Sequence, residues 1–224
     1  PAHCVLSRPE DTRPYECDGL SLYRALPMAV VLPETETQVQ AVLRLCKALN
    51  VPVVARGAGT GLSGGAMPHA QGVLLGLAKF NRIRRIDPQA AIAVVEPGVR
   101  NLAVSEAVAP YGLYYAPDPS SQKACTIGGN VAENSGGVHC LKYGLTVHNV
   151  LKVRLVTMDG DIVELGSLAP DSPGPDLLSV FVGSEGMLGV VTEVTLRLTP
   201  KPALASVIMA SFDDVDRASD AVAG

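Results

Sequence analysis

The sequence predicts a globular fold of mixed helices and strands, and three observations support this. Hydrophobic residues make up 47% and charged residues 18% of the 224 residues, as in ordered proteins with a buried core. A β-α-β unit is evident over residues 28–56, and the last third of the chain alternates apolar and polar residues as strands do. A chain of this length forms one domain or two lobes.

Composition argues against several classes of function. The formal net charge of −4 gives no electrostatic reason to bind nucleic acid or an anionic membrane. The five cysteines are scattered without a C-x-x-C pair, which is typical of free thiols in a reducing compartment. No apolar run reaches the ~18 residues of a membrane span. The chain begins at Pro1 and stops at Gly224 inside an expected helix, so we expect it to be part of something longer.

The first quarter contains the clearest elements. Residues 1–25 are polar and rich in turn formers, so we expect an irregular lead-in. A strand from Met28 ends at Pro33, and Thr35 then caps a helix whose apolar residues at 39, 42, 43, 46 and 49 follow helical spacing. Asn50 ends this helix, and the next strand begins at residue 53.

The middle of the chain alternates strands, turns and one helix. Strands are expected over residues 73–77 and 91–96, with a basic turn at 82–87 between them. Asn101 is expected to cap an alanine-rich helix that runs to about residue 109. Two prolines then make a rigid, turn-prone corner at 117–121.

The last third is predicted to be rich in strands. Residues 150–157 and 161–165 form a hairpin around Asp159-Gly160, a strong turn pair. The chain is then expected to form a loop over 168–175, a short helix over 176–182, a long strand over 189–199 and the start of another strand over 203–212.

The segment Val53–Met67 organises the chain. A β-branched apolar run opens it, and glycines follow at positions 57, 59, 61, 64 and 65. Such a backbone readily adopts positive φ angles and turns several N–H groups toward one point. We therefore predict an anion cradle with one cation, Arg56, at its entrance.

Four interpretations compete for this glycine loop. A Walker phosphate loop is excluded because Gly65 and Ala66, and not Lys and Ser or Thr, follow Gly64. The Rossmann dinucleotide fingerprint matches at residues 59, 61 and 64, but it requires a helix at the third glycine, where a turn-rich segment leads into a strand. A flexible surface loop and a phosphate-binding loop between two strands, outside the Rossmann class, remain.

A second glycine-rich segment spans Thr126–Gly137. Its side chains Asn130, Asn134 and Ser135 add hydrogen-bond donors and acceptors without adding charge. Two such segments favour one large, elongated, polar ligand clamped between two lobes, against the alternative of chance enrichment in glycine.

The order of several short motifs is more specific than any one of them. From the N-terminus they are Pro33–Glu36, Arg56–Gly61, Pro97-Gly98, Pro117–Pro119, Thr126–Asn130, Asp159-Gly160 and Gly183–Val191. In this order they resemble the FAD-linked oxidase family, of the vanillyl-alcohol oxidase and p-cresol methylhydroxylase type. Over residues 26–212 the chain most resembles the branch with the glycolate oxidase D subunit and the D-lactate and D-2-hydroxyglutarate dehydrogenases.

The resemblance implies an α+β FAD-binding domain of two lobes, in which helices flank mixed sheets and FAD lies between the lobes. It implies an N-terminal lead-in over residues 1–25, a first lobe over 26–88 and a second lobe over 89–212. Residues 213–224 would begin a C-terminal substrate or cap domain.

The resemblance also implies which residues hold the cofactor. The glycine loop would hold the pyrophosphate, segments 117–121 and 126–137 would line the pyrophosphate and isoalloxazine, and residues 189–191 with Glu185 would lie at the adenosine end. The implied cofactor-binding residues are Arg56, Gly57, Ala58, Gly59, Thr60, Gly61, Leu62, Ser63, Pro97, Gly98, Pro117, Asp118, Pro119, Ser120, Thr126, Ile127, Gly128, Gly129, Ala132, Asn134, Ser135, Gly136, Gly137, Glu185, Gly189, Val190 and Val191.

One departure from the family bears on how the flavin is held. Many relatives carry a histidine at the place of Thr60, where it bonds covalently to the flavin, and others use a cysteine within the region 128–137. This chain has neither, so we predict non-covalent FAD. Cys125 and Cys140 flank that region and are interpreted as inert packing thiols.

The implied reaction is oxidation of a small D-2-hydroxy acid, glycolate or D-lactate, to the 2-oxo acid by hydride transfer to flavin N5. We assign no catalytic residue and no metal. The histidines His3, His69, His139 and His148 form no cluster with metal spacing, and each is more often a surface or structural histidine. Tyr143, after Lys142, either approaches the flavin ring or packs in the core. Because relatives carry their substrate histidines in a C-terminal domain, we expect this fragment alone to be inactive.

The resemblance further implies a second flavin subunit and an iron–sulfur subunit as partners, in a cytoplasmic or peripherally membrane-associated complex. No nucleic-acid partner is expected. Two alternatives remain. One is a nucleotide-binding or assembly module without a redox role. The other is an enolpyruvyl reductase-type flavoenzyme of the same fold, which would need its own substrate domain and proton donor.

Overall fold

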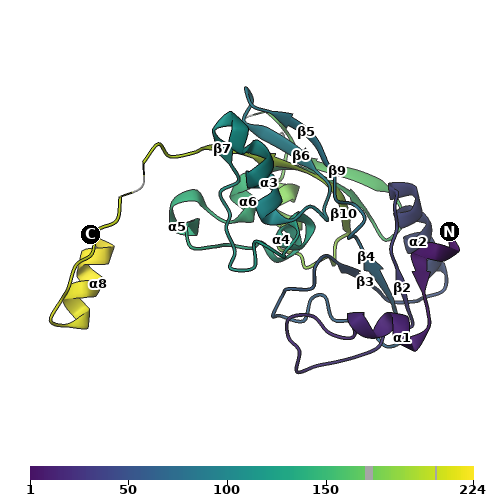
Figure 1. The fold of residues 1–224 in the computed structure, drawn as a ribbon. Helices are drawn as coiled ribbons and strands as arrows, with labels where there is room; N and C mark the ends of the chain where they lie inside the picture. Colours follow the sequence, from purple (N-terminus) through teal and green to yellow (C-terminus); the bar gives the residue numbers. More distant parts are fainter. Residues whose placement is uncertain (170–173, 205) are drawn as a thin grey trace.

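A computed structural model describes residues 1–169, 174–204 and 206–224 and shows two sheets with helices packed around them (Figure 1). The first sheet has the order β1-β2-β4-β3. Its strands β2, β4 and β3 are parallel, and β1 joins β2 in antiparallel fashion. Their bounds are β1 Val5–Leu6, β2 Ala29–Val31, β3 Val53–Arg56 and β4 Val73–Gly76.

The second sheet is antiparallel, with the order β5-β6-β10-β8-β9. Buried and exposed residues alternate little along its central strand β10, because both faces of the strand are covered along most of its length. The bounds are β5 Ile83–Asp87, β6 Ile92–Val95, β8 Val150–Val156, β9 Ile162–Gly166 and β10 Val190–Arg197, and a separate pair joins β7 Leu113–Tyr114 to β11 Thr199–Pro200.

Helices cover the sheets and fill the space between them. In Figure 1, α3, α4 and α6 lie beside the second sheet, and α2 lies beside the first. Their bounds are α1 Pro9–Thr12, α2 Glu36–Ala48, α3 Asn101–Val108, α4 Ile127–Glu133, α5 Cys140–Tyr143, α6 Thr146–Asn149, α7 Leu177–Phe181 and α8 Val215–Ala223, and the 3-10 helices are Ala2–Cys4, Arg13–Tyr15 and Ala109–Tyr111.

Two apolar clusters form the core. The larger one packs α3 and α4 against the second sheet and includes Val104, Ile127 and Leu196. The smaller one joins the sheets, because Leu43 of α2 packs with residues of β4 and with Val190 of β10. Burial of these apolar surfaces is the main force that holds the two sheets together.

The clearest sequence predictions are confirmed. The Thr35 side chain accepts the backbone N–H of Gln38 at 3.3 Å and so caps α2, and Asn50 follows the helix with a φ of 53°. Strands β8 and β9 form the expected hairpin, with Gly160 at a φ of 76°. Helix α7 and strand β10 also lie where they were expected.

Several local predictions were wrong. Residues 82–87 are not a basic turn, because Ile83 and Ile86 pack on the core and the segment forms β5. Asn101 does not cap α3. Its side chain is buried and donates to the Pro117 carbonyl at 3.1 Å, and Arg100 takes the cap position.

The two ends of the chain also differ from expectation. The lead-in is not wholly irregular, since it contains β1 and three short helices. The described residues of 203–212 form no strand, and an extended segment leads to α8. The glycine-rich segment 126–137 contains α4. Part of the loop expected at 168–175 lies outside the described residues.

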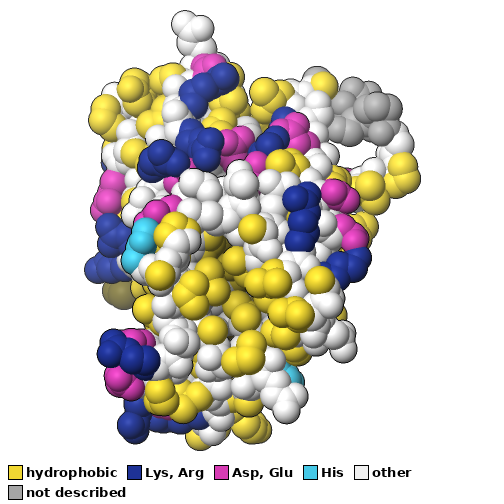
Figure 2. Space-filling model, turned by 90° about the vertical axis from the view of Figure 1, so that its right-hand side faces the viewer, with side chains coloured by type: hydrophobic (Ala, Val, Ile, Leu, Met, Phe, Trp, Pro, Cys, Tyr) yellow, Lys and Arg dark blue, Asp and Glu magenta, His cyan; other side chains and the backbone are white. Residues whose placement is uncertain are grey.

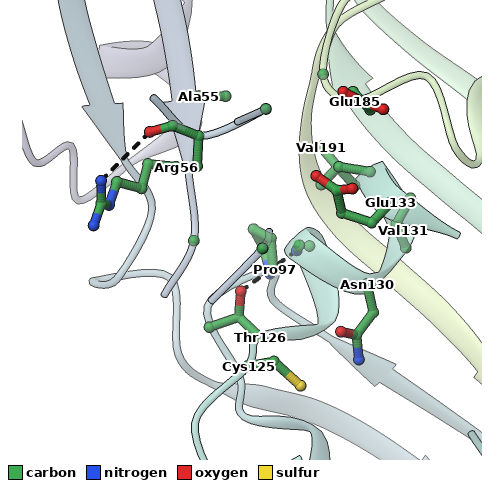
Figure 3. A pocket seen from close by; sticks show the side chains of 18 of the residues that line it. Ala55, Arg56, Pro97, Cys125, Thr126, Asn130, Val131, Glu133, Glu185 and Val191 are labelled. Atoms are coloured by element: carbon green, nitrogen blue, oxygen red, sulfur yellow. Dashed lines mark hydrogen bonds between the residues drawn. The ribbon is translucent and has the colours of Figure 1, made fainter. Parts of the chain in front are cut away.

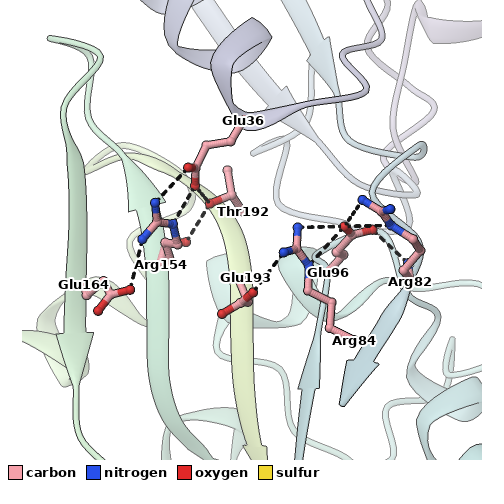
Figure 4. Close-up of polar contacts among 8 residues, drawn as sticks. All are labelled: Glu36, Arg82, Arg84, Glu96, Arg154, Glu164, Thr192 and Glu193. Atoms are coloured by element: carbon pink, nitrogen blue, oxygen red, sulfur yellow. Dashed lines mark hydrogen bonds and ion pairs between the residues drawn. The ribbon is translucent and has the colours of Figure 1, made fainter.

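Ion pairs on one side of the molecule connect α2 to the second sheet (Figure 4). Glu36 at the start of α2 accepts hydrogen bonds from Arg154 of β8 at 2.9 Å and from Thr192 of β10 at 2.8 Å. These contacts lower the pKa of the Glu36 carboxyl, with the Arg154 hydrogen bond as the main cause. They fix the position of α2 over the second sheet.

The surface carries charges of both signs side by side. Figure 2 shows Lys and Arg intermixed with Asp and Glu on that face, with hydrophobic side chains gathered toward its middle. This face offers no continuous positive area for a nucleic acid.

Glu96 is the most deeply buried charged residue among the ion pairs of Figure 4. Its side chain accepts the Arg82 backbone N–H at 2.9 Å and the guanidinium groups of Arg82 and Arg84 at 2.9 and 3.0 Å. Burial alone would raise the pKa of Glu96, but these hydrogen bonds outweigh it and the pKa is lowered. Glu96 directly precedes Pro97, so its hydrogen bonds hold the start of the turn that follows β6.

Replacing Glu96 with glutamine should therefore destabilise the fold in a pH-dependent way. We expect E96Q to lower the free energy of unfolding by about 1–3 kcal/mol near pH 7, because the arginines lose a charged acceptor. A lowered folded-state pKa means that this contribution is present above the ordinary glutamate pKa of 4.5 and is lost as the pH falls below it. Urea unfolding at several pH values measures this, and E164Q, at a half-exposed carboxylate, is the control. A pH-independent difference would contradict the account.

Candidate functional site

The glycine loop begins where β3 ends. Gly59 and Gly64 have φ angles of 68° and 84°, which side chains with a Cβ rarely adopt. Within the described chain, no backbone N–H from Gly57 to Ala66 donates a hydrogen bond to another protein group. A run of unpartnered amides on a folded loop is a place where a ligand with many acceptor atoms binds.

Arg56 lies beneath this loop and not at the entrance to a cradle. Its side chain turns away from the cavity, as Figure 3 shows, and Nη1 donates to the Cys17 carbonyl at 2.7 Å. It also reaches the carbonyls of Tyr15 and Ala66, both at 3.4 Å. Burial lowers the pKa of the guanidinium, and the nearby Asp18 carboxylate opposes that effect. The prediction of a cation at the entrance is therefore corrected, because the Arg56 side chain turns away from the cavity and its Nη1 donates to backbone carbonyls.

The lead-in forms the floor under the loop. A Cβ on Gly19 would lie 2.6 Å from the Gly61 carbonyl oxygen and 2.9 Å from that of Thr60. Only glycine allows this approach, so the first residues of the chain are part of the site. Sequence reasoning missed this role because nothing in a turn-rich, polar segment predicts a distant partner.

Helix α4 forms the opposite wall. Its N-cap Thr126 accepts the Gly129 N–H at 3.4 Å, and a Cβ on Gly57 would collide with the Thr126 hydroxyl. A Cβ on Gly128 would lie 2.6 Å from Cβ of Pro97. Glycines thus allow the loop after β3, the turn after β6 and α4 to approach one another closely around one space.

That space is a cavity of about 290 Å³ between the glycine loop, α4 and the start of β10 (Figure 3). Asn130 is 2% exposed, and its Nδ2 has no hydrogen-bond partner. The buried Oγ of Ser184 also has no hydrogen-bond partner. Both residues line the cavity. Buried polar atoms without partners in a native fold call for a ligand or water.

Two carboxylates give one end of the cavity a negative character. A Cβ on Gly65 would lie 2.9 Å from Oε1 of Glu133 and 3.2 Å from Oε2 of Glu185. Ser63 donates its hydroxyl to the other oxygen of Glu133 at 3.0 Å. Carboxylates repel phosphate and accept hydrogen bonds from hydroxyl groups, so this end suits a sugar better than a phosphate.

Most of the residues that the sequence implicated come together here. The cavity is lined by Arg56, Gly57, Ala58, Gly59, Thr60, Gly61, Leu62, Pro97, Thr126, Gly128, Gly129, Ala132, Ser135, Glu185, Gly189, Val190 and Val191. The implicated residues that do not line it are Ser63, Gly98, Pro117, Asp118, Pro119, Ser120, Ile127, Asn134, Gly136 and Gly137.

The residues outside the cavity make other contacts. Ile127 is fully buried in the core, and Gly98 packs against backbone, where a Cβ would lie 2.5 Å from the Leu77 carbonyl oxygen. The Asn134 side chain accepts the Val147 N–H at 3.0 Å. Asp118 pairs with His139 and not with the cavity. These residues support the walls of the cavity without lining it.

Sequence reasoning missed other lining residues. Gly65, Asn130, Glu133 and Gly186 stand within or beside the glycine-rich segments, so their position was a usable signal. Leu77 and Phe181 resemble core residues and gave none. Gly65 lies in the glycine loop, and Ser121, Asn130, Val131 and Glu133 lie in the two segments that were expected to line the cofactor, although none of them was named as a ligand. The other lining residues that the sequence did not implicate are Ala55, Ala66, Leu77, Cys125, Phe181, Ser184 and Gly186.

Cysteine and histidine side chains add little chemistry inside the cavity. Burial raises the pKa of the Cys125 thiol, which keeps it in its unreactive form. Elsewhere, His3, Cys4 and Glu34 bring ligand atoms within 4.8 Å of one another. The Lys79 ammonium lies 2.7 Å from Glu34 and 3.9 Å from the Cys4 sulfur, so a cation already serves this group and we assign no metal there.

Comparison with known protein families shows to which family this chain belongs. A sequence profile described as FAD binding domain matches residues 27–166, which is more than half of the chain. The chain belongs to this family. The expected fold class, an α+β FAD-binding domain with helices around mixed sheets, is thereby confirmed.

Individual relatives agree with this assignment. The chain is 64% identical over 218 residues to glycolate oxidase subunit GlcD of Escherichia coli strain K12, covering 97% of this chain and 44% of the relative. It is 43% identical to GlcD of Bacillus subtilis, covering 93% and 44%. It is 35% identical to a D-lactate dehydrogenase of Anaerostipes hadrus, covering 95% and 45%. The chain thus spans less than half the length of these relatives.

A solved structure supports the fold. Alkyldihydroxyacetonephosphate synthase matches with a TM-score of 0.80 at 21% identity, over 90% of this chain and 39% of the other. Among the described residues, no helix has both the length and the apolar character needed to cross a bilayer.

The close glycine contacts predict a difference between neighbouring positions of α4. We expect G128A to lower the free energy of unfolding by about 1–3 kcal/mol, because its methyl group overpacks against Pro97. G129A is the matched control, since its Cβ would lie 3.4 Å from the Thr126 hydroxyl oxygen. We expect it to change stability by less than about 1 kcal/mol, because alanine favours helix. Chemical denaturation measures both, and equal effects would contradict the packing described.

Proposed function

We propose that this chain is the FAD-binding half of a flavin-dependent oxidoreductase that oxidises a small D-2-hydroxy acid, glycolate or D-lactate, to the 2-oxo acid. The observation that carries the proposal is the run of unpartnered amides in the loop 57–66, most of whose residues line the cavity. The names of the relatives, glycolate oxidase subunit and D-lactate dehydrogenase, supply the substrate class.

The residues present fit FAD. A pyrophosphate needs several N–H donors, and the glycine loop offers them without a cationic side chain. Among the described residues, Arg56 is the only Lys, Arg or His lining the cavity, and its Nη1 already donates to carbonyls. The unpaired Nδ2 of Asn130 and Oγ of Ser184 are further polar groups for the cofactor. Each neutral hydrogen bond contributes about 1 kcal/mol net, so tight binding rests on many of them.

The charges suggest how the cofactor is oriented. The pyrophosphate would lie against residues 57–60, because the loop from Gly61 onward lies near Glu133, with a Cβ on Gly61 3.6 Å from its Oε1. Glu133 and Glu185 would accept hydroxyl groups of the adenosine ribose, and the backbone of Gly189–Val191 would meet the adenine. The isoalloxazine would then lie toward Ser121 and Ser135. Thr60 cannot form a covalent bond to the flavin, so we propose that FAD is held non-covalently.

The rest of the organisation is proposed on the same basis. The first lobe would span residues 26–88 and the second 89–212, with 213–224 opening a further domain. Because two relatives are named as subunits, we propose that the protein works in a complex, with a second flavin subunit and an iron–sulfur subunit. Bound FAD would accept the hydride of the substrate, and this chain's residues would bind and orient the cofactor.

The proposal predicts a spectral change in the complete protein. Anaerobic mixing of the FAD-loaded protein with glycolate or D-lactate should bleach the flavin absorbance. L-2-hydroxy acids serve as the control and should bleach it far more slowly. Acid precipitation should release the flavin into solution. If no acid of either hand reduces the flavin, the proposed reaction is wrong.

A further inference from the structure

A turn of the lead-in, residues 17–20, passes directly beneath the glycine loop. A Cβ on Gly19 would lie 2.6 Å from the Gly61 carbonyl oxygen and 2.9 Å from that of Thr60. Gly19 is not one of the residues with a positive φ angle, so its backbone conformation would accept alanine. Glycine is therefore required at residue 19 by the close approach of the loop alone.

Each of these two contacts fixes the direction of a peptide unit in the loop. The carbonyl oxygens, and not their carbons, are the atoms closest to Gly19. The carbonyl and the N–H of one trans peptide unit point in opposite directions. The N–H groups of Gly61 and Leu62, which belong to the same two units, therefore point away from the lead-in. Both residues line the cavity, and within the described chain neither N–H donates to another protein group.

Two hydrogen bonds hold the turn in place. Oδ1 of Asp18 accepts the Leu20 N–H at 2.8 Å and so closes a turn around Gly19. The Cys17 carbonyl accepts Nη1 of Arg56 at 2.7 Å. Because Arg56 ends β3, the turn is tied to the strand from which the glycine loop begins.

Stability alone does not explain this arrangement. The Asp18 residue is 6% exposed, and its Oδ2 has no hydrogen-bond partner. A buried carboxylate oxygen without a partner costs folding free energy. Beyond the turn, Leu22 and Tyr23 are 87% and 63% exposed, so the lead-in gains little there from apolar burial. A contact that costs stability and fixes two amides of a ligand-binding loop points to a role in binding.

The turn precedes the part of the chain that the family profile matches, which begins at residue 27. Residues 17–20, all of which the structure describes, do not line the cavity. Their effect on a ligand in the cavity must therefore pass through the glycine loop.

We propose that Asp18 and Gly19 are positioning residues for FAD. The turn 17–20 holds two carbonyls of the glycine loop on its own side. It thereby leaves the amides of the same peptide units, at Gly61 and Leu62, free to donate to phosphate or ribose oxygens of the cofactor. This role rests on the FAD site of the proposed function and deepens it. Coupling between two sites is reciprocal, so bound FAD also holds the turn in place.

Amide hydrogen exchange on the complete protein, with and without FAD, tests this coupling. We expect FAD to slow exchange of the Leu20 N–H by at least about fivefold, because the turn opens less often when the loop above it is held. The Gly160 N–H, which donates to the Thr157 carbonyl in the β8–β9 hairpin, is the control and should not change. A lead-in that only packs under the loop would give the same Leu20 exchange with and without FAD.

Two matched glycine variants of the complete protein separate positioning from stability. We expect G19A to raise the FAD dissociation constant by about tenfold or more, because the added methyl group displaces the two carbonyls and turns the amides away from the cofactor. G72A is the control, since its Cβ would lie 2.8 Å from the Pro52 carbonyl oxygen and Gly72 does not line the cavity. Both variants should melt earlier than the wild type, and G72A should keep the wild-type affinity for FAD.

The role of Asp18 is tested by removing its whole side-chain acceptor or only its charge. D18A removes the acceptor of the Leu20 N–H, and we expect it to weaken FAD binding by about fivefold or more. D18N keeps one oxygen for that bond and should bind FAD within about twofold of the wild type. Equal losses in D18A and D18N would contradict the role given to Asp18, because charge and not the turn would then decide the affinity.

The outcomes are distinct. If the wild type binds FAD, G19A binds it as well as G72A does, and FAD leaves Leu20 exchange unchanged, the inference is wrong and the proposed function stands. If the wild type does not bind FAD, the proposed function and the inference fail together. If G19A does not fold, exchange of the Leu20 N–H in the wild type decides alone.

Discussion

The site depends on one buried cation whose hydrogen bonds go to backbone carbonyls of the same chain. Arg56, at the end of β3, is 9% exposed, and its Nη1 reaches the carbonyls of Tyr15, Cys17 and Ala66. A guanidinium withdrawn from water must find such acceptors, so it pulls the lead-in and the far end of the glycine loop toward β3. The loop amides are left without protein acceptors, and most of the loop residues line the cavity. A residue that looks like an anion ligand in the sequence thus acts as the support of a neutral anion cradle.

The second constraint is the fixed position of the two sheets. Leu43 and Val190 pack in one cluster, and the bonds of Glu36 with Arg154 and Thr192 hold α2 against the second sheet. Because the glycine loop belongs to the first sheet and α4 packs on the second, this junction sets the width of the cavity. The ion pairs lie beside the apolar cluster, so charge fixes the orientation that apolar burial permits.

The sequence predicted what depends on local chemistry. Helix α2 with its Thr35 cap, the hairpin at Asp159-Gly160 and the glycine loop follow from short-range rules, and the order of motifs led to the right family. Features that depend on distant partners could not be predicted. Residues 82–87 look like a basic turn until Glu96 supplies their acceptor, and Gly137 looks like a cofactor contact until Asp118 fills its space. Composition and spacing do not show which segments meet.

FAD that bridges three separate segments should protect all three together from amide hydrogen exchange. Exchange is measured on the chain with and without FAD, residue by residue. The account predicts that FAD slows exchange together at residues 57–65, at 128–135 and at 184–191. Protection confined to one of these segments, or absent from the glycine loop, would contradict it.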